Sequence, residues 1–426
     1  MTLAIIPIIF LALLLLGVPI AFVIGITSLA TVMIQGTIPL NALPQYMFIG
    51  LDSFPLLAIP FFILAGLLMS RTGISGRLID FTMILFGRMP GALAQVNIGT
   101  SIFFAGITGA AVADTAAVGT VLIPAMKKEG YPAAYSAAVT AASSCIGPIV
   151  PPSIILVVYG IAANASIASL LIAGIIPGVL MGLSMGVVVW FQAVKHKFPR
   201  REESYSFKKL LIAFINALPA LLMPLIIVGG IMGGVFTATE SACVAVVYSL
   251  LLGLFTKTLK VSDLYDVCIQ ASVVSGVVLL IISAAKFFSI IMVMNHIPAA
   301  LTNLFLSISD NRVIILLMIN VLLLIVGCFM EISAACIILA PILLPVVTNL
   351  GIHPVHFGII MCVNLAIGLA TPPVGPTLFV ACKIGKTTIE EITMAIWPFL
   401  LASVVALLLI TFIPWLSLVL PATFIW

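Results

Sequence analysis

The fold is decided by residues 109–153, which read GAAVADTAAVGTVLIPAMKKEGYPAAYSAAVTAASSCIGPIVPPS. This stretch holds one carboxylate, Asp114, in a small and apolar run. A charged turn follows, and then a Gly-Pro-x-x-Pro-Pro sequence inside the next apolar run. A carboxylate and a broken helix are both costly at membrane depth, and both usually mark a pathway for ions or substrate. The stretch therefore predicts a site inside a membrane domain.

The same arrangement recurs at residues 327–376, which read GCFMEISAACIILAPILLPVVTNLGIHPVHFGIIMCVNLAIGLATPPVGP. The shared features are an acid, a proline ten residues later and a Pro-Pro pair: Asp114, Pro124 and Pro151-Pro152 match Glu331, Pro341 and Pro372-Pro373. The acids and the first prolines match at an offset of 217, and the Pro-Pro pairs at 221. Interrupted segments in corresponding positions of two halves are the best sequence pointer to the binding site of a secondary transporter.

The composition excludes a soluble protein. Hydrophobic residues make up 63% of the 426 residues and charged residues 7%, against about 25% charged in soluble domains. The first ten residues, MTLAIIPIIF, lack the basic region of a secretory signal, so we expect them to begin the first membrane helix. The seven cysteines show no CxxC spacing and are expected to pack in the core. We expect no nucleic-acid partner, and the sequence lacks the P-loop, HExxH and GxSxG motifs of nucleotide-driven or hydrolytic proteins.

The hydrophobic runs predict an all-α polytopic membrane protein built from two repeats. Each repeat makes five crossings, one of them broken, and adds one re-entrant helical hairpin. The predicted boundaries are a first repeat at 1–194 (hairpin about 93–126, broken helix about 134–161), a cytoplasmic connector at 195–209 and a second repeat at 210–426 (hairpin about 314–348, broken helix about 355–381). We expect the first hairpin to turn near residues 112–116. An odd number of crossings inverts the second repeat relative to the first.

The distribution of basic residues supports this count. With a periplasmic N-terminus, 15 of the 17 Lys and Arg fall in cytoplasmic segments, as the positive-inside rule requires. Both termini are then periplasmic, in a multi-pass protein of the bacterial inner membrane. The mouth of the first hairpin, near Lys127, is cytoplasmic, and the mouth of the second, near His353, is periplasmic.

At each break the carbonyls that end one half-helix suit Na⁺, and the free N–H groups that begin the next suit an anion. Na⁺ is a hard cation and prefers oxygen ligands. The candidate Na⁺ residues are Asp114, Thr115, Ser143, Ser144, Gly147, Glu331, Ser333, Asn364 and Gly368. The candidate substrate-binding residues are Pro151, Pro152, Ser153, Thr371, Pro372, Pro373 and Thr377. The alternative is that the small hydroxyl residues only tighten helix packing.

Five motifs carry a resemblance to a known family: GITGAAVADTAAVGTVLIPAM, GPIVPPS, FTATES, GCFMEISAACIILAPILLP and NLAIGLATPPVGPT. In this order they resemble the large membrane subunit of tripartite ATP-independent periplasmic (TRAP) transporters, over nearly the whole chain. The resemblance implies Na⁺-driven transport by an elevator-type motion of the hairpins and broken helices. It also implies a small four-helix membrane subunit, expected here as a separate chain, and a periplasmic substrate-binding protein. The implied substrates are carboxylates such as C4-dicarboxylates, sialic acid and other sugar acids. No enzymatic activity and no organic cofactor are expected.

The alternative within the same class is a stand-alone divalent-anion/Na⁺ symporter or an arsenite-type permease. Four further polar residues have open roles. Glu240 either caps a helix start or takes part in transport, and Lys286 either extends toward the membrane surface or pairs with Glu331 or Glu240. His353 and His356 are too few for a metal site and are expected in a loop that meets the binding protein.

Overall fold

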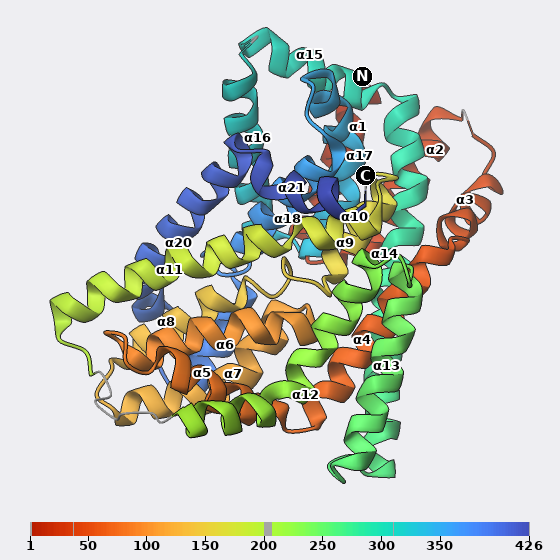
Figure 1. The fold of residues 1–426 in the computed structure, drawn as a ribbon. Coiled ribbons are helices and arrows are strands. Elements are labelled where there is room, and N and C mark those ends of the chain that lie inside the picture. Colours follow the sequence, from red (N-terminus) through yellow and green to blue (C-terminus); the bar gives the residue numbers. More distant parts are fainter. Residues whose placement is uncertain (1, 37, 200–206, 310, 426) are drawn as a thin grey trace.

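The computed structural model describes residues 2–36, 38–199, 207–309 and 311–425, and the regular structure in these ranges is entirely helical. The first half contains α1 (Thr2–Leu15), α2 (Ile20–Gln35), α3 (Ala42–Leu51), the 3-10 helix η1 (Phe54–Leu57), α4 (Ala58–Arg71), α5 (Ile74–Phe86), α6 (Ala92–Thr108), α7 (Ala111–Lys128), α8 (Ala133–Ser144), α9 (Ile154–Ala162), α10 (Ile167–Ala173) and α11 (Ile175–His196). Figure 1 shows this half in red to yellow-green.

The second half contains α12 (Phe207–Met232), α13 (Ala238–Phe255), α14 (Val261–Met294), α15 (Ile297–Ile308), α16 (Arg312–Phe329), α17 (Ile332–Asn349), α18 (Pro354–Gly368), α19 (Pro376–Gly385), α20 (Ile389–Phe412) and α21 (Trp415–Phe424). Part of the predicted connector, residues 200–206, lies outside the described residues. In the described part of the chain, eight helices are long and apolar enough to cross a membrane. The all-helical, multi-pass class is therefore confirmed.

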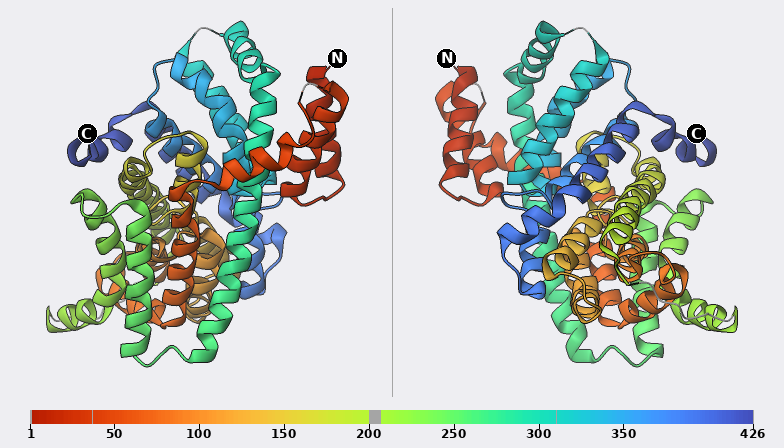
Figure 2. Two further views of the ribbon diagram at one scale, coloured as in Figure 1. Left: turned by 90° about the vertical axis from the view of Figure 1, so that its right-hand side faces the viewer. Right: turned by 90° about the vertical axis from the view of Figure 1, so that its left-hand side faces the viewer.

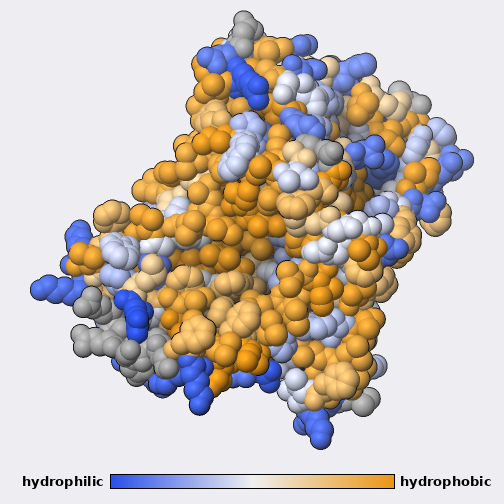
Figure 3. Space-filling view, viewed as in Figure 1, coloured by the Kyte–Doolittle hydropathy of each residue, from blue (hydrophilic) through white to orange (hydrophobic). Residues whose placement is uncertain are grey.

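The surface has the form expected of a membrane protein. Hydrophobic residues cover the middle of the face in Figure 3, and hydrophilic residues gather at its opposite ends. The turn between α13 and α14 lies at one end of the molecule, and α15 lies at the other (Figure 1). α14 runs the full height between these ends in both side views (Figure 2).

Each half contains a helical pair that turns sharply. α6 ends at Gly109, which adopts a left-handed conformation with φ 62°, and the extended residue Ala110 precedes α7. α16 ends at the extended residue Met330, and Glu331 is the N-cap of α17. The first turn therefore lies at residues 109–110 and not at the predicted 112–116. Glycine tolerates the positive φ that reverses the chain, whereas the predicted residues continue into the first turn of α7.

The helix boundaries also correct the register between the two halves. α7 and α17 each have 18 residues and begin at Ala111 and Ile332, an offset of 221. α8 and α18 begin at Ala133 and Pro354, again an offset of 221. The Pro-Pro pairs share this offset, so Asp114 and Glu331 are not equivalent positions. The sequence match at an offset of 217 aligned the two acids, whereas the helix boundaries separate their positions by four residues, about one helical turn.

Each half also contains an interrupted helix, formed by α8 and α9 in the first and by α18 and α19 in the second. The interruptions include cis peptide bonds at Pro151-Pro152 and Pro372-Pro373. Lys127 Nζ at the end of α7 donates a 2.8 Å hydrogen bond to the Gly385 carbonyl at the end of α19. Tyr159 Oη in the last turn of α9 donates a 2.8 Å bond to the Pro354 carbonyl at the start of α18. The two interrupted helices therefore run antiparallel.

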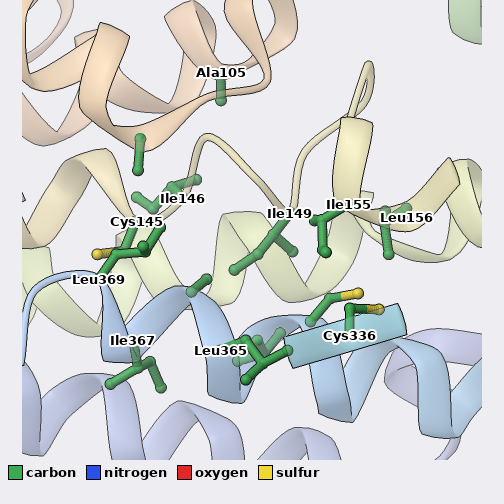
Figure 4. Close-up of a cluster of buried hydrophobic side chains, with 14 of the residues drawn as sticks. Ala105, Cys145, Ile146, Ile149, Ile155, Leu156, Cys336, Leu365, Ile367 and Leu369 are labelled. Carbon is green, nitrogen blue, oxygen red and sulfur yellow. The ribbon is translucent and has the colours of Figure 1, made fainter. Parts of the chain in front are cut away.

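The interruptions share one apolar core. Figure 4 shows side chains from the first interruption, including Cys145, Ile149 and Ile155, beside Leu369 and Cys336 of the second half. All five belong to a single cluster of buried hydrophobic residues. α19 contacts α7 and α8, and α9 contacts α17 and α18. The two hairpins and the two interrupted helices thus form one interlocked body.

Three helices were not anticipated from hydrophobicity. α3 and α15 are 10 and 12 residues long, too short to register as spans. The last apolar stretch of the sequence is divided into α20 and α21 at Ile413 and Pro414, because Pro414 lacks the N–H that would continue α20. The predicted repeat boundaries themselves stay a prediction.

Candidate functional site

A cavity of about 390 Å³ lies where the two hairpins meet the two interruptions. We call it the central cavity. Its lining comprises a first tip (residues 109–112), a second tip (residues 327–333), and residues Pro148, Ile154, Ile155, Leu369, Val374 and Pro376 of the interruptions. Ile63 of α4 and Val274 and Val278 of α14 complete it. This volume suits a small organic molecule.

Four helices begin at the central cavity. The first residues of α7, α9, α17 and α19 are Ala111, Ile154, Ile332 and Pro376, and all four line it. The first N–H groups of a helix have no partner inside the helix, and the helix dipole adds about half a positive charge at this end. The Glu331 carboxylate already caps α17, and Pro376 at the start of α19 has no N–H. The remaining first-turn N–H groups of these helices favour a bound anion.

Both tips approach the interruption of their own half closely. A Cβ atom at Gly109 would overlap the carbonyl oxygen of Pro152. A Cβ atom at Gly368 would overlap the backbone of Gly327, with the Gly327 Cα 2.6 Å away. Glycine at these positions allows backbone to pack on backbone. The tips and the interruptions therefore form a continuous wall on one side of the cavity.

Asp114 is the most unusual buried group in the site. Its side chain is fully buried, and Thr108 Oγ1 donates a hydrogen bond to Oδ1. The other oxygen, Oδ2, is buried and has no hydrogen-bond partner in the part of the chain that the structure describes. It points at the first interruption, because a Cβ at Gly147 would overlap it and would lie 3.1 Å from the Ser144 carbonyl oxygen. An unpaired buried carboxylate oxygen is unstable, so this arrangement suits a small cation.

Asn364 provides a second buried oxygen without a partner. Its Nδ2 donates 2.8 Å hydrogen bonds to Asn320 Oδ1 and to the Ile360 carbonyl. Its Oδ1 is buried and accepts none. At the corrected offset of 221, Asn364 occupies the position of Ser143, which contacts Ser101 Oγ at 2.9 Å. The oxygen of Asn364 is a neutral candidate ligand for a cation near the second interruption.

The remaining candidate Na⁺ residues are tied into local structure. Thr115 Oγ1 donates to the Ala111 carbonyl at 2.9 Å, and Ser144 Oγ donates to the Thr140 carbonyl at 2.8 Å. Glu331 Oε2 accepts a 2.9 Å hydrogen bond from the Ala334 N–H and so caps α17. Among the described lining residues of the central cavity, Glu331 is the only charged one, and Ser333 lines the cavity beside it.

The candidate substrate residues lie beside the cavity and do not line it. Ser153 Oγ donates to the Pro148 carbonyl and accepts from the Leu156 N–H. Thr371 and Thr377 donate 2.8 Å hydrogen bonds to the Ile367 and Leu369 carbonyls. The two Pro-Pro pairs shape the interruptions without lining the cavity. Many of the lining residues that the sequence analysis did not name lie at a tip or in the first turn after a break, and their position next to the breaks was the available signal. Ile63, Val274 and Val278 lie inside α4 and α14 and had no such signal.

The other polar residues have structural partners. Glu240 and Thr237 form a capping box at the start of α13, which bears out the capping role. His356 is buried within α18 and contacts Ser417 at 2.9 Å, so it is not part of a loop. His353 is the N-cap of α18. Lys286 forms no ion pair with Glu331 or Glu240 in the described part of the chain, and it lines a separate cavity.

Antiparallel interrupted helices that meet at a cavity, in a chain whose described part has eight helices long and apolar enough to cross a membrane, are the arrangement of a membrane transport protein. The chain belongs to the family described as "Tripartite ATP-independent periplasmic transporter, DctM component", whose family model matches residues 8–416. The resemblance seen in the sequence motifs is thereby confirmed. The family consists of transporter permeases and is not an enzyme family.

The chain is similar to two named permeases of this family. It is 42% identical over 402 residues to the isethionate TRAP transporter permease protein DctMQ of Oleidesulfovibrio alaskensis, covering 94% of this chain and 63% of that protein. It is 38% identical over 419 residues to the sialic acid TRAP transporter large permease protein SiaM of Vibrio cholerae, covering 97% of each. Its fold is similar to the crystal structure of the YdaH transporter of Alcanivorax borkumensis, with a TM-score of 0.60 over 88% of this chain and 89% of that one. Identity to YdaH is 13%, so this likeness shows the fold alone.

Proposed function

We propose that this chain imports a small organic acid across the bacterial inner membrane, driven by Na⁺, as the large permease subunit of a TRAP transporter. The observation that carries the proposal is the convergence of four helix N-termini on one cavity between the tips and the interruptions. Apart from Glu331 and Ser333 the cavity walls are mostly apolar, so helix-start N–H groups are the main attraction for a carboxylate or sulfonate.

Na⁺ would act as the co-transported substrate. The first candidate site is the unpaired Oδ2 of Asp114 with the Ser144 carbonyl beside Gly147. The second is the unpaired Oδ1 of Asn364. Bound Na⁺ would neutralise Asp114 directly behind the first tip and so favour the arrangement in which the N-termini of α7 and α9 face the anion. Coupling follows because the anion binds more tightly to that arrangement.

The proposed movement is an elevator-type displacement of one body against another. The interlocked body of α6–α9 and α16–α19 would move, and α14 with α2, α3, α4 and α13 would form the scaffold, since α14 contacts α2, α3 and α4, and α4 contacts α13. The antiparallel course of the two interrupted helices supports an inverted repeat. An inverted repeat gives access to opposite sides of the membrane in two equivalent states.

The partners and substrates of the relatives extend the proposal. We expect a small four-helix membrane subunit and a periplasmic binding protein that delivers the substrate. Isethionate and sialic acid are named for similar permeases, and both are small organic acids. The stand-alone divalent-anion/Na⁺ symporter and the arsenite-type permease remain the competing functions.

The test is uptake in proteoliposomes that contain the chain and its small subunit. Radiolabelled succinate, N-acetylneuraminate and isethionate would be offered with and without the binding protein, under an inward Na⁺ gradient or an equal K⁺ gradient. We expect uptake of at least one acid only with both Na⁺ and the binding protein. Uptake by the chain alone would favour a stand-alone symporter. No Na⁺ dependence, with otherwise active vesicles, would contradict the coupling.

A further inference from the structure

A second cavity, of about 290 Å³, lies next to the central cavity, and we call it the Lys286 cavity. α3 and the residues after it supply Asp52 and Ser53, α14 supplies Lys286 and Ser289, and the end of α9 leads to Asn164. Its lining thus carries both a cation and several hydrogen-bonding groups, whereas the central cavity is mostly apolar and has no cationic side chain among its described lining residues. Such a lining fits a hydrated or charged ligand.

The two cavities lie along one path. On α14, Val274 and Val278 line the central cavity, and Ile282 and Lys286 line the Lys286 cavity. A spacing of four residues places all of them on one helix face, and the eight residue steps from Val278 to Lys286 span about 12 Å.

The same order holds on the other two shared walls. On α9, Ile154 and Ile155 line the central cavity, and Val158 and Ile161 line the Lys286 cavity. On α17, Ser333 lines the central cavity and Ile337 the other. The Lys286 cavity is therefore stacked on the central cavity, toward the α14–α15 end of the molecule (Figure 1).

Among the described residues, Lys286 has no partner that compensates its charge. It lies within a candidate membrane span, Ser262–Met294. Within the described ranges it forms no hydrogen bond or ion pair, even with Asp52 on the same cavity. Its stem packs on α3, because a Cβ at Gly50 would lie 2.7 Å from Lys286 Cβ. A fixed, unpaired cation in a membrane span is costly unless it faces water or a ligand.

We propose that the Lys286 cavity is a second, outer anion site, through which the organic acid passes between the extracytoplasmic face and the central cavity. The assignment of the outer side follows from the basic turn between α13 and α14, with Lys257 and Lys260, at the other end of α14. Lys286 attracts the carboxylate or sulfonate, and Asp52 opposes it and prevents tight retention. This inference rests on the proposed import function.

The test uses the complete transporter with its binding protein and small subunit. Uptake is measured against the concentration of whichever acid the wild type transports among succinate, N-acetylneuraminate and isethionate. We expect Lys286→Met to raise KM about tenfold, and Asp52→Asn to lower it about threefold, because the two charges act on the anion with opposite sign. Lys286→Arg should retain most of the wild-type KM. Lys257→Met removes an exposed lysine that lines neither cavity and should leave KM unchanged.

The outcomes separate this inference from the function on which it rests. Absence of wild-type uptake for all three acids would overturn the proposed function and this inference with it. Wild-type uptake together with an unchanged KM in Lys286→Met would overturn the outer site alone. If Lys286→Met does not assemble, as judged by size-exclusion chromatography, Asp52→Asn decides: a lowered KM supports the site, and an unchanged or raised KM overturns it.

Discussion

The two hairpins are built on the same frame but hold their acids differently. α7 and α17 have equal lengths, and each begins at the central cavity beside an interruption of its own half. In the first half, Asp114 lies within the first turn of α7 and is fully buried. In the second half, Glu331 precedes α17 as its N-cap and is exposed to the cavity.

This difference separates two kinds of chemistry. The Asp114 carboxyl group has one oxygen bonded to Thr108 and one unpaired among the described residues, so the first half places an ionisable acid in a buried position. The second half brings a neutral unpaired oxygen from Asn364 to the equivalent region, and Glu331 is used to hold a helix start. The helical arrangement is present in both halves, but the buried acid is present only in the first. We therefore expect the first half to contribute more to cation binding than the second.

The largest expected effect distinguishes the two acids. Asp114→Asn keeps the shape of the side chain but removes its charge, and we expect Na⁺-driven uptake to fall by about 100-fold or more, equivalent to about 2.8 kcal/mol. Glu331→Gln keeps a carbonyl oxygen that can accept from the Ala334 N–H, so uptake should change by less than about threefold. Initial rates in proteoliposomes at matched protein content provide the measurement.

The control for this pair is the amount and melting temperature of each purified variant. Loss of activity in Asp114→Asn counts only if the protein elutes and melts like the wild type. Equal losses in both variants would show that the two acids act alike, contrary to the structural comparison.

The sequence predicted the class of fold because its evidence was local. Pro-Pro pairs cannot continue a helix, so the interruptions near Pro152 and Pro373 could be located from the residues alone. The register between the halves could not, because α17 carries two prolines, Pro341 and Pro345, four residues apart. The acid-to-proline spacing selected Pro341, whereas equal helix lengths place Pro345 opposite Pro124. Shifting the alignment of α7 and α17 by one helical turn leaves the same residues on each buried face, so the hydrophobic pattern did not reveal the misalignment.

The candidate site was predicted less completely than the fold. The sequence indicated oxygen-bearing side chains near the breaks, but hydroxyl groups such as those of Thr371 and Thr377 satisfy local carbonyls. Apolar residues such as Ala111 and Ile154 line the cavity instead, because the groups exposed there are backbone N–H groups at helix starts. Every residue type except proline carries such groups, so no pattern of side chains identifies them. The Na⁺ and substrate roles of the named residues stay predictions.

A second, smaller effect compares the close contacts in the two halves. Gly368→Ala would force a methyl group against the backbone of Gly327, which cannot rotate away, whereas Gly147→Ala would meet the Asp114 carboxylate, which can. We expect Gly368→Ala to destabilise the protein by about 2–3 kcal/mol and Gly147→Ala by about 1 kcal/mol. Thermal unfolding in detergent measures the difference.

Among the protein that remains folded, transport activity should be lower in Gly147→Ala than in Gly368→Ala, the reverse of the order expected for stability. Gly147→Ala displaces Asp114 Oδ2 and should reduce the apparent affinity for Na⁺, whereas folded Gly368→Ala should retain more of it. If Gly147→Ala transported with normal Na⁺ dependence, the Asp114 oxygen that faces Gly147 would not be a cation ligand.

The smallest expected effect compares Asn364 with Ser143, which share a position at the offset of 221. Asn364→Leu removes the unpaired Oδ1 at nearly constant volume, together with the Nδ2 donor to Asn320 and Ile360, so its stability should fall as well. The half-saturating Na⁺ concentration of the folded variant should rise about tenfold, or about 1.4 kcal/mol. Ser143→Ala removes a hydroxyl whose bonds are internal, to Ser101 and Asn97, so only stability should fall, by about 1 kcal/mol. Na⁺ titrations of uptake at saturating acid separate these outcomes. An unchanged Na⁺ dependence in Asn364→Leu would confine cation binding to the first half, because the neutral oxygen would then serve packing alone.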